Sequence, residues 1–300
     1  MKYTAILSYK RRLSSEKTVR VMHIIALVCL IVNLALVSGK FDFDAKSASS
    51  VSSQLKDFTT IAREQGTDKV SVHNYGWFYD RHLKDIRFET FTLLEIGFAT
   101  GNGAQSWRAF LPNARVVGFE IGCTKENAPD NAWITQSPNY KDFIKRGNLF
   151  CMSALDYPVA ESVLSTFTSP LRVLIEDGGH SDKEMVLSFF YYFPRLVPGG
   201  LYFCEDLGVI YDSSTKRKRQ KNFITSVIEP LQDAVQFDPV SAKNNNGGRL
   251  KVFREMVKQI SCAQGICMIE RSDKEAPTEA LEYYKSVWSS KAWSEPLSQN

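Results

Sequence analysis

Two apolar segments of this chain each end abruptly on a pair of adjacent carboxylates. The first, LRVLIEDGGH, ends on Glu176 and Asp177, and the second, GLYFCEDL, ends on Glu205 and Asp206. Parallel strands of an open α/β sheet carry ligands just beyond their C-terminal ends, so two such strands would bring these acids to one crevice, with His180 a turn away. Crowded carboxylates repel one another unless they are protonated or share a cation. The pattern therefore predicts a site for a hard divalent metal ion, which prefers oxygen ligands.

A third segment, FTLLEIGFATGNGAQSW, predicts a buried strand, a glycine-rich turn and the start of a helix. Gly97, Gly101 and Gly103 let the backbone turn sharply and approach a ligand closely. About 20 residues on, the next strand ends on Glu120, which is placed to accept hydrogen bonds from ribose hydroxyls. Such a turn and acid suit both NAD enzymes and S-adenosylmethionine (SAM) enzymes. Glu95 favours SAM, because it would repel a pyrophosphate but can orient the amino-acid part of SAM.

The order of these motifs resembles a known family. The segments GTDK…HNYGWFY, LLEIG…GNG…SW, FLPNARVVGFEI, IEDGGH, FPRLVPGGLYFCEDL and ISCAQGICMIE are together similar to the metal-dependent sugar O-methyltransferases of macrolide and tetracenomycin biosynthesis. Those enzymes are grouped in sequence with the cephalosporin hydroxylase-type proteins. The resemblance spans residues 66–271 and implies a class I SAM-dependent methyltransferase that uses Mg²⁺ or another divalent cation.

The resemblance also implies roles for the strand-end residues. In the family pattern Asp177 binds magnesium, Glu205 and Asp206 supply the other metal ligands, and His180 acts as the general base. The chain departs from the pattern at Glu176, where the family commonly has Asp, and this change leaves the ligand position untouched. The turn FATGNG also differs from the commoner Gly-Gly-Ser type.

Methyl transfer to an alcohol needs these groups on chemical grounds as well. A free alcohol is too weak an acid at neutral pH to act as the nucleophile, but coordination to Mg²⁺ lowers its pKa and fixes its orientation. His180 can then accept the proton. The predicted function is a SAM-dependent, Mg²⁺-assisted O-methyltransferase that acts on a hydroxyl of a sugar, a glycosylated acceptor or another vicinal diol.

Two other functions stay open. A hydroxylase-type oxygenase is possible by relationship, but iron sites of that kind usually use two histidines and one carboxylate, and only His180 is suitably placed in the sequence. A membrane-tethered scaffold with a decayed methyltransferase fold is disfavoured by the intact set of acids. Measuring SAM binding with and without Mg²⁺ separates these alternatives.

Three further residues are assigned to the site. Ser153, at the end of the third expected strand, is placed with the cofactor-binding residues. His73 and Tyr75 belong to an aromatic segment that precedes the first strand. In the resembled family this segment lies beside the cofactor and the acceptor, so both residues are predicted to contact the substrate.

The remaining pattern predicts the fold that positions these residues. Ser181 and Glu184 have the spacing of a capping box at the start of a helix. Residues 252–271 predict a terminal antiparallel strand pair. Parallel strands are predicted at 91–96, 116–120, 149–154, 171–176 and 200–204. The expected fold is a Rossmann-like, seven-stranded SAM-dependent methyltransferase sheet, mostly parallel with a terminal antiparallel hairpin, preceded by an N-terminal transmembrane helix.

That helix is predicted from residues 21–39, which contain no Asp, Glu, Lys or Arg. At ~1.5 Å per residue the segment nearly matches a ~30 Å hydrocarbon core. Basic residues precede it, so the positive-inside rule predicts a single-pass type II protein facing the lumen of the endoplasmic reticulum or Golgi. The alternative is a cleaved signal peptide and secretion. The predicted organisation is a basic cytosolic tail 1–20, an anchor 21–39, a stem 40–60, a methyltransferase domain 61–275 and a C-terminal helix or tail 276–300.

The net charge of +4 is concentrated locally. The run KRKRQK at 216–221 is interpreted as a solvated insertion or a lid; no nucleic-acid motif accompanies it, and no nucleic-acid partner is expected. A homo-oligomer stays possible. Among the six cysteines, Cys123, Cys151 and Cys204 are expected to be small hydrophobes. Whether Cys262 and Cys267 are bonded is left open.

Overall fold

The computed structural model describes residues 55–207, 222–236 and 250–289, and the compact unit that carries the site comprises Lys56–Asn300. Its seven-stranded sheet has the order β3-β2-β1-β4-β5-β7-β6. The first five strands pair in parallel, and β7 pairs antiparallel with both β5 and β6. In chain order the strands are β1 Thr92–Ile96, β2 Arg115–Glu120, β3 Leu149–Cys151, β4 Leu171–Glu176, β5 Leu201–Cys204, β6 Val257–Ala263 and β7 Ile266–Arg271.

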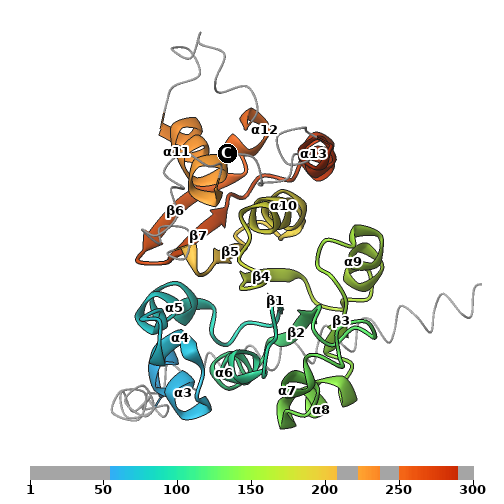
Figure 1. Cartoon of the computed structure of the whole chain (residues 1–300). Helices are drawn as coiled ribbons and strands as arrows, with labels where there is room; N and C mark the ends of the chain where they lie inside the picture. Colours follow the sequence, from blue (N-terminus) through green and yellow to red (C-terminus); the bar gives the residue numbers. More distant parts are fainter. Residues whose placement is uncertain (1–54, 208–221, 237–249, 290–300) are drawn as a thin grey trace, which may run out of the picture. The chain divides into compact units, whose positions relative to one another are not determined.

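Helices cover both faces of the sheet. They are α3 Phe58–Gln65, α4 Asp68–Ser71, α5 Gly76–Leu83, α6 Asn102–Phe110, α7 Ala132–Thr135, α8 Pro138–Lys145, α9 Tyr157–Leu164, α10 Asp182–Tyr192, α11 Glu229–Gln236, α12 Lys251–Arg254 and α13 Thr278–Trp288. Successive side chains of a strand point to opposite faces. Leu93 of β1 therefore packs into one core, with α3, α5 and α6, and Leu94 into the other, with α10 and α13. Figure 1 shows these two groups of helices on opposite sides of the sheet.

Helix α10 fixes the segment that follows β4. Its N-cap is Ser181, whose hydroxyl accepts a hydrogen bond from the backbone N–H of Glu184 at 3.3 Å and donates to the Glu184 carboxylate at 2.8 Å. Every residue from Met185 to Tyr192 is buried. A helix that is apolar almost all round must lie within the core. The loop that carries His180 is therefore held between a buried strand and a buried helix.

The predicted fold class needs two corrections, and the first concerns the sheet. A mostly parallel sheet with a terminal antiparallel hairpin was expected. The sheet is mixed, because β7 pairs antiparallel with β5 as well as with β6, so two of its six strand pairings are antiparallel. β6 and β7 are joined by a tight turn at Gly265, which has φ 80°, and a two-residue connection allows only an antiparallel pair. Moreover β7, the later strand in the sequence, is the one that lies beside β5.

The second correction concerns the membrane. Within residues 55–207, 222–236 and 250–289 no helix is long and apolar enough to cross a bilayer. The predicted transmembrane helix, 21–39, lies outside the described residues, as do the cleaved-signal alternative and the basic run 216–221. An apolar run of suitable length is necessary for a span but does not by itself make one. The predicted single-pass, lumen-facing placement is therefore not supported.

Candidate functional site

The two acidic strand ends meet at one edge of the sheet, as their sequences predict. β4 and β5 are parallel neighbours, with Glu176 opposite Cys204, and the backbone N–H of Glu205 donates to the carbonyl of Glu176 at 2.9 Å. Asp177 is the first residue after β4, and its backbone N–H donates to the carbonyl of Ile96 at the end of β1. Three strands therefore deliver their C-terminal residues to the same place.

Asp177, His180 and Asp206 each place one potential ligand atom within 4.8 Å of the others. Nε2 of His180 lies 3.5 Å from Oδ2 of Asp206. All three side chains are partly exposed. Two carboxylates and one imidazole facing a common space suit a hard divalent cation.

Lys69 of α4 stands behind this triad, and sequence reasoning gave it no role. Its Nζ lies 2.6 Å from Oδ2 of Asp177, 2.8 Å from Oε1 of Glu205 and 3.4 Å from Oε1 of Glu95, and its side chain is 2% exposed. Oε1 of Glu205 also accepts a hydrogen bond from the hydroxyl of Tyr79. Glu205 therefore faces an ammonium group and a phenol, and it lies outside the group of potential ligand atoms formed by Asp177, His180 and Asp206.

Burial disfavours the charged form of Glu95, Glu205 and Lys69. It raises the pKa of Glu95 to about 7, and burial together with the charge of Asp177 raises the pKa of Glu205 to about 8. Burial alone would lower the pKa of the Lys69 ammonium, but attraction to the three carboxylates outweighs it and holds this pKa well above its ordinary value. A divalent cation would shift the balance toward ionised carboxylates.

The predicted substrate residues lie beside Asp206. The hydroxyl of Tyr75 donates to Oδ1 of Asp206 at 2.9 Å, and Nε2 of His73 lies 3.6 Å from the same oxygen. The rings of His73 and Tyr75 stack, with centroids 5.0 Å apart. A second histidine therefore lies near Asp206, but the group of potential ligand atoms among the described residues contains His180 as its one histidine.

The glycine-rich turn joins β1 to α6 and packs directly on the exit of β4. Gly97 has φ 89°, and a Cβ there would lie 1.8 Å from the carbonyl oxygen of Asp177, so only glycine fits. Glu95 is buried just before this turn, and its Oε1 accepts a hydrogen bond from the indole of Trp107 at 2.9 Å. Within the described part of the chain, Oε2 of Glu95 is buried without a partner. This free acceptor is available to a ligand.

Glu120, at the end of β2, holds the turn from the other side. Its Oε2 accepts hydrogen bonds from the backbone N–H groups of Phe98 and Ala99, both at 2.9 Å. Its Oε1 accepts from the backbone N–H of Gly122 at 2.6 Å. The carboxylate predicted to receive a ribose thus also ties the glycine-rich turn to the loop after β2.

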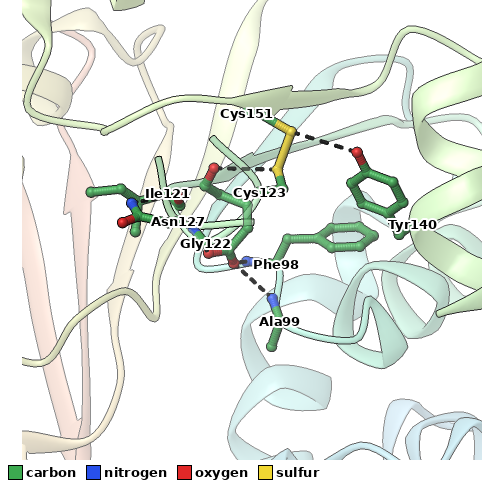
Figure 2. Close-up of a disulfide and its surroundings, with 9 residues drawn as sticks. Phe98, Ala99, Ile121, Gly122, Cys123, Asn127, Tyr140 and Cys151 are labelled. Carbon is green, nitrogen blue, oxygen red and sulfur yellow. Dashed lines mark hydrogen bonds between the residues drawn. A yellow bond between two sulfur atoms is a disulfide. The ribbon is translucent and has the colours of Figure 1, made fainter. Parts of the chain in front are cut away.

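A disulfide joins that loop to the end of β3, as Figure 2 shows. Cys151 is opposite Glu120 in the sheet register, so a chain that turns back after β2 brings Cys123 to it. Cys123 and Cys151 were expected to be small hydrophobes, and that expectation was wrong because register brings together two residues 28 positions apart. The pair left open, Cys262 and Cys267, is bonded across β6 and β7. Cys204 is free and buried, as expected.

One cavity of about 780 Å³ connects these parts. The predicted site residues that line it are Glu95, Gly97, Gly103, Glu120, Ser153, Asp177, His180 and Asp206. Those that do not line it are Gly101, Glu205, His73 and Tyr75. At the end bordered by the loop after β2, the half-exposed side chains of Ile121 and Trp133 also line the cavity. Sequence reasoning missed this apolar end, because single exposed apolar residues in a loop carry no periodic signal.

The comparisons with known proteins agree with this geometry. No family model matches the chain. The 8-demethyl-8-alpha-L-rhamnosyl tetracenomycin-C 2'-O-methyltransferase of Streptomyces olivaceus is 28% identical over 158 residues, which cover 50% of this chain and 38% of that protein. The mycinamicin VI 2''-O-methyltransferase of Micromonospora griseorubida is 27% identical over 169 residues, 53% of this chain and 38% of that protein. The match therefore spans less than two fifths of the length of these curated relatives.

Among solved structures, the MycE methyltransferase of the mycinamycin pathway, in complex with Mg, SAH and mycinamycin VI, is similar with a TM-score of 0.56 and 19% identity. The match covers 73% of this chain and 55% of that chain. The resemblance drawn from the motifs is thus confirmed: the relatives are sugar O-methyltransferases of macrolide and tetracenomycin pathways, and the fold is that of a class I SAM-dependent methyltransferase. The comparisons support neither a membrane anchor nor an oligomer.

Proposed function

We propose that this chain is a SAM-dependent, Mg²⁺-assisted O-methyltransferase that acts on a hydroxyl of a sugar or another vicinal-diol acceptor. One observation carries the proposal. The triad Asp177, His180 and Asp206 and the glycine-rich turn after Glu95 border the same cavity. A reacting hydroxyl and a sulfonium methyl group must meet, and a shared cavity is the least that such a reaction requires.

The residues present fit a divalent ion. Asp177 and Asp206 offer oxygen ligands in reach of a common point, with His180 beside them. We propose that the two aspartates bind the ion. Glu205 remains a predicted third ligand, through the oxygen that is not engaged by Lys69.

The residues present also fit SAM. The unpaired Oε2 of Glu95 suits the ammonium group of its methionine part, and Gly97 lets the backbone approach closely. Ser153 and Glu120 border the cavity farther along and are proposed to face the nucleoside. Gly101 shapes the turn with φ 82°.

When bound, Mg²⁺ would lower the pKa of the acceptor hydroxyl, and SAM would supply the methyl group. His180 then moves the proton. Its Nδ1 is buried, so Nε2 is the nitrogen that meets the substrate. Nε2 of His180 would take the hydroxyl proton, and bound SAM would supply the methyl group to the acceptor oxygen, with S-adenosylhomocysteine as the leaving product. The carboxylate of Asp206, 3.5 Å away, stabilises the imidazolium that forms.

The acceptor is proposed to lie near His73 and Tyr75, which both approach Oδ1 of Asp206. The hydroxylase alternative is disfavoured, because the triad contains two carboxylates and one histidine, whereas such iron sites use two histidines and one carboxylate.

The test is calorimetry with SAM, with Mg²⁺ or with EDTA, followed by mass spectrometry of products from a panel of glycosides. The panel pairs each vicinal diol with its deoxy analogue. We expect SAM binding and a gain of one methyl group, dependent on Mg²⁺ and lost with the deoxy analogues. Absence of SAM binding would contradict the proposal, and SAM binding without product from any diol would favour the non-catalytic scaffold.

A further inference from the structure

Lys69 is a cation built into the acidic site. Three carboxylates from three neighbouring strand ends converge on its ammonium group: Glu95 in β1, Asp177 after β4 and Glu205 after β5. A lysine that is 2% exposed is rare unless it is paired. Its burial and its three ion pairs indicate that Lys69 contributes to the arrangement of these carboxylates.

The surrounding structure holds Lys69 in place. Thr67 caps its helix, and the carbonyl of Lys69 accepts a hydrogen bond from the backbone N–H of Tyr75 at 3.0 Å. A Cβ at Gly103 would lie 3.0 Å from Cε of Lys69 and 2.8 Å from Oε1 of Glu95, so this glycine of α6 leaves room for the pair. The stem of Lys69 is thus enclosed, and its ammonium group has one place to lie.

The negative and positive side chains of the site do not balance. Glu95, Asp177, Glu205 and Asp206, when ionised, exceed the single positive charge of Lys69 by three. A divalent ion and the sulfonium of SAM together supply three. With a divalent ion at the outer pair, Asp177 and Asp206, the charges of Lys69 and the sulfonium would together balance the inner carboxylates, Glu95 and Glu205.

On the basis of the proposed function, we propose that Lys69 is a positioning residue for the divalent ion. Its ammonium group holds Oδ2 of Asp177 at 2.6 Å, and the same carboxylate offers a potential ligand atom within 4.8 Å of those of His180 and Asp206. Asp177 thus bridges the internal cation and the bound one. The competing idea is that the ammonium group merely occupies the ion's place and leaves when the ion binds.

The two ideas predict opposite changes in Mg²⁺ affinity when the ammonium group of Lys69 is removed. The affinity is measured by calorimetry with Mg²⁺ alone as the titrant. If Lys69 positions Asp177, Lys69→Met weakens Mg²⁺ binding at least tenfold, and Lys69→Arg, which keeps the charge, weakens it less. Mg²⁺ binding that is unchanged or tighter in Lys69→Met would overturn the proposal, since it would mean competition or a purely structural role.

The matched control is Arg271→Met. Arg271 is another buried cation, 2% exposed, but it donates to the backbone carbonyls of Leu196 and Lys274 and not to the site. We expect this variant to lose stability without a change in Mg²⁺ affinity. A similar loss of Mg²⁺ affinity in both variants would assign the effect to general destabilisation and overturn the proposal.

Lys69→Met leaves three carboxylates without a cation, two of them fully buried, and is at risk of not folding. Lys69→Met/Glu205→Gln removes one charge of each sign and keeps an acceptor for Tyr79. It should bind Mg²⁺ more weakly than Glu205→Gln alone, and equal affinities would overturn the proposal. If the unmodified protein binds no Mg²⁺, the proposed function itself fails; if it binds Mg²⁺ as tightly as Lys69→Met does, only the role of Lys69 fails.

Discussion

The Cys123–Cys151 disulfide should stabilise both the fold and the cofactor end of the cavity. The bond closes a loop of 28 residues, for which loss of chain entropy in the unfolded state predicts about 3.5 kcal/mol of stabilisation at 25 °C. The Cys262–Cys267 bond closes a loop of 5 residues, for which the same relation gives about 2 kcal/mol. The chain thus contains its own control, a second disulfide with a smaller expected effect.

The perturbation is Cys123→Ala/Cys151→Ala, compared with Cys262→Ala/Cys267→Ala. Alanine is chosen because serine would bury a hydroxyl group at the buried positions 123 and 267. Urea unfolding followed by circular dichroism gives the free energy of unfolding of each variant. We expect the first pair to lose more stability than the second by about 1.5 kcal/mol, the difference between the two loop-closure values.

The two variants should differ more in SAM binding. The loop that the first pair closes includes Trp133, which lines the cavity. Ser137 and Asn139 of this loop also donate to the carbonyl of Thr100 in the glycine-rich turn. The second pair lies at the other edge of the sheet. Calorimetry should show weaker SAM binding for the first pair alone. Equal losses of stability, or unchanged SAM affinity in the first pair, would refute this account of the disulfide.

Three further outcomes are expected. His180→Ala should lower turnover by ~10²–10⁴-fold, the usual range for a general base, with SAM affinity unchanged in calorimetry; unchanged turnover would remove His180 from the mechanism. Asp206→Asn should weaken Mg²⁺ binding while keeping the backbone at φ 57°, because asparagine also tolerates that conformation; retained affinity would exclude Asp206 as a ligand. Without metal, the raised pKa values of Glu95 (about 7) and Glu205 (about 8) mean that the folded state holds protons that the unfolded chain has released. Stability in EDTA should therefore fall as pH rises from about 5 to 8, by up to ~1.4 kcal/mol per pH unit for each group, and Mg²⁺ should reduce the fall. Thermal melts that show stability rising over this range in EDTA would contradict the sign.

The sequence was sufficient for the strand ends because their signals are local. The apolar run before Glu176 and Asp177 needs no knowledge of the rest of the chain to predict a buried strand, and a general property of parallel sheets then places its end beside the next strand's end. The glycine-rich turn was found in the same way. Its Gly97 proved necessary for contact with the carbonyl of Asp177, a reason that only the assembled sheet reveals.

The residues that were missed act over long distances in the sequence. Lys69 is 108 residues from Asp177 and 136 from Glu205, and nothing in GTDK indicates which acids will surround it. Cys123 and Cys151 become neighbours through the register of β2 and β3, which the sequence does not specify residue by residue. A buried lysine could have been suspected only by asking what neutralises so many acids at one edge of a sheet.

The backbone of the site gives an independent reason to think that its geometry serves a ligand. Outside glycine, His180 (φ 53°) and Asp206 (φ 57°) are two of the three residues with positive φ in the described part of the chain. For an L-residue this conformation costs roughly 1–2 kcal/mol. Helix α10 and the buried strands hold both residues in it, and relaxing either would turn its side chain away from the common space of the triad. Such strain persists where the surrounding structure over-determines it, and it gathers at functional sites. The two strained residues are two of the three members of the triad, and this coincidence is what an ion site predicts and an incidental cluster of acids does not.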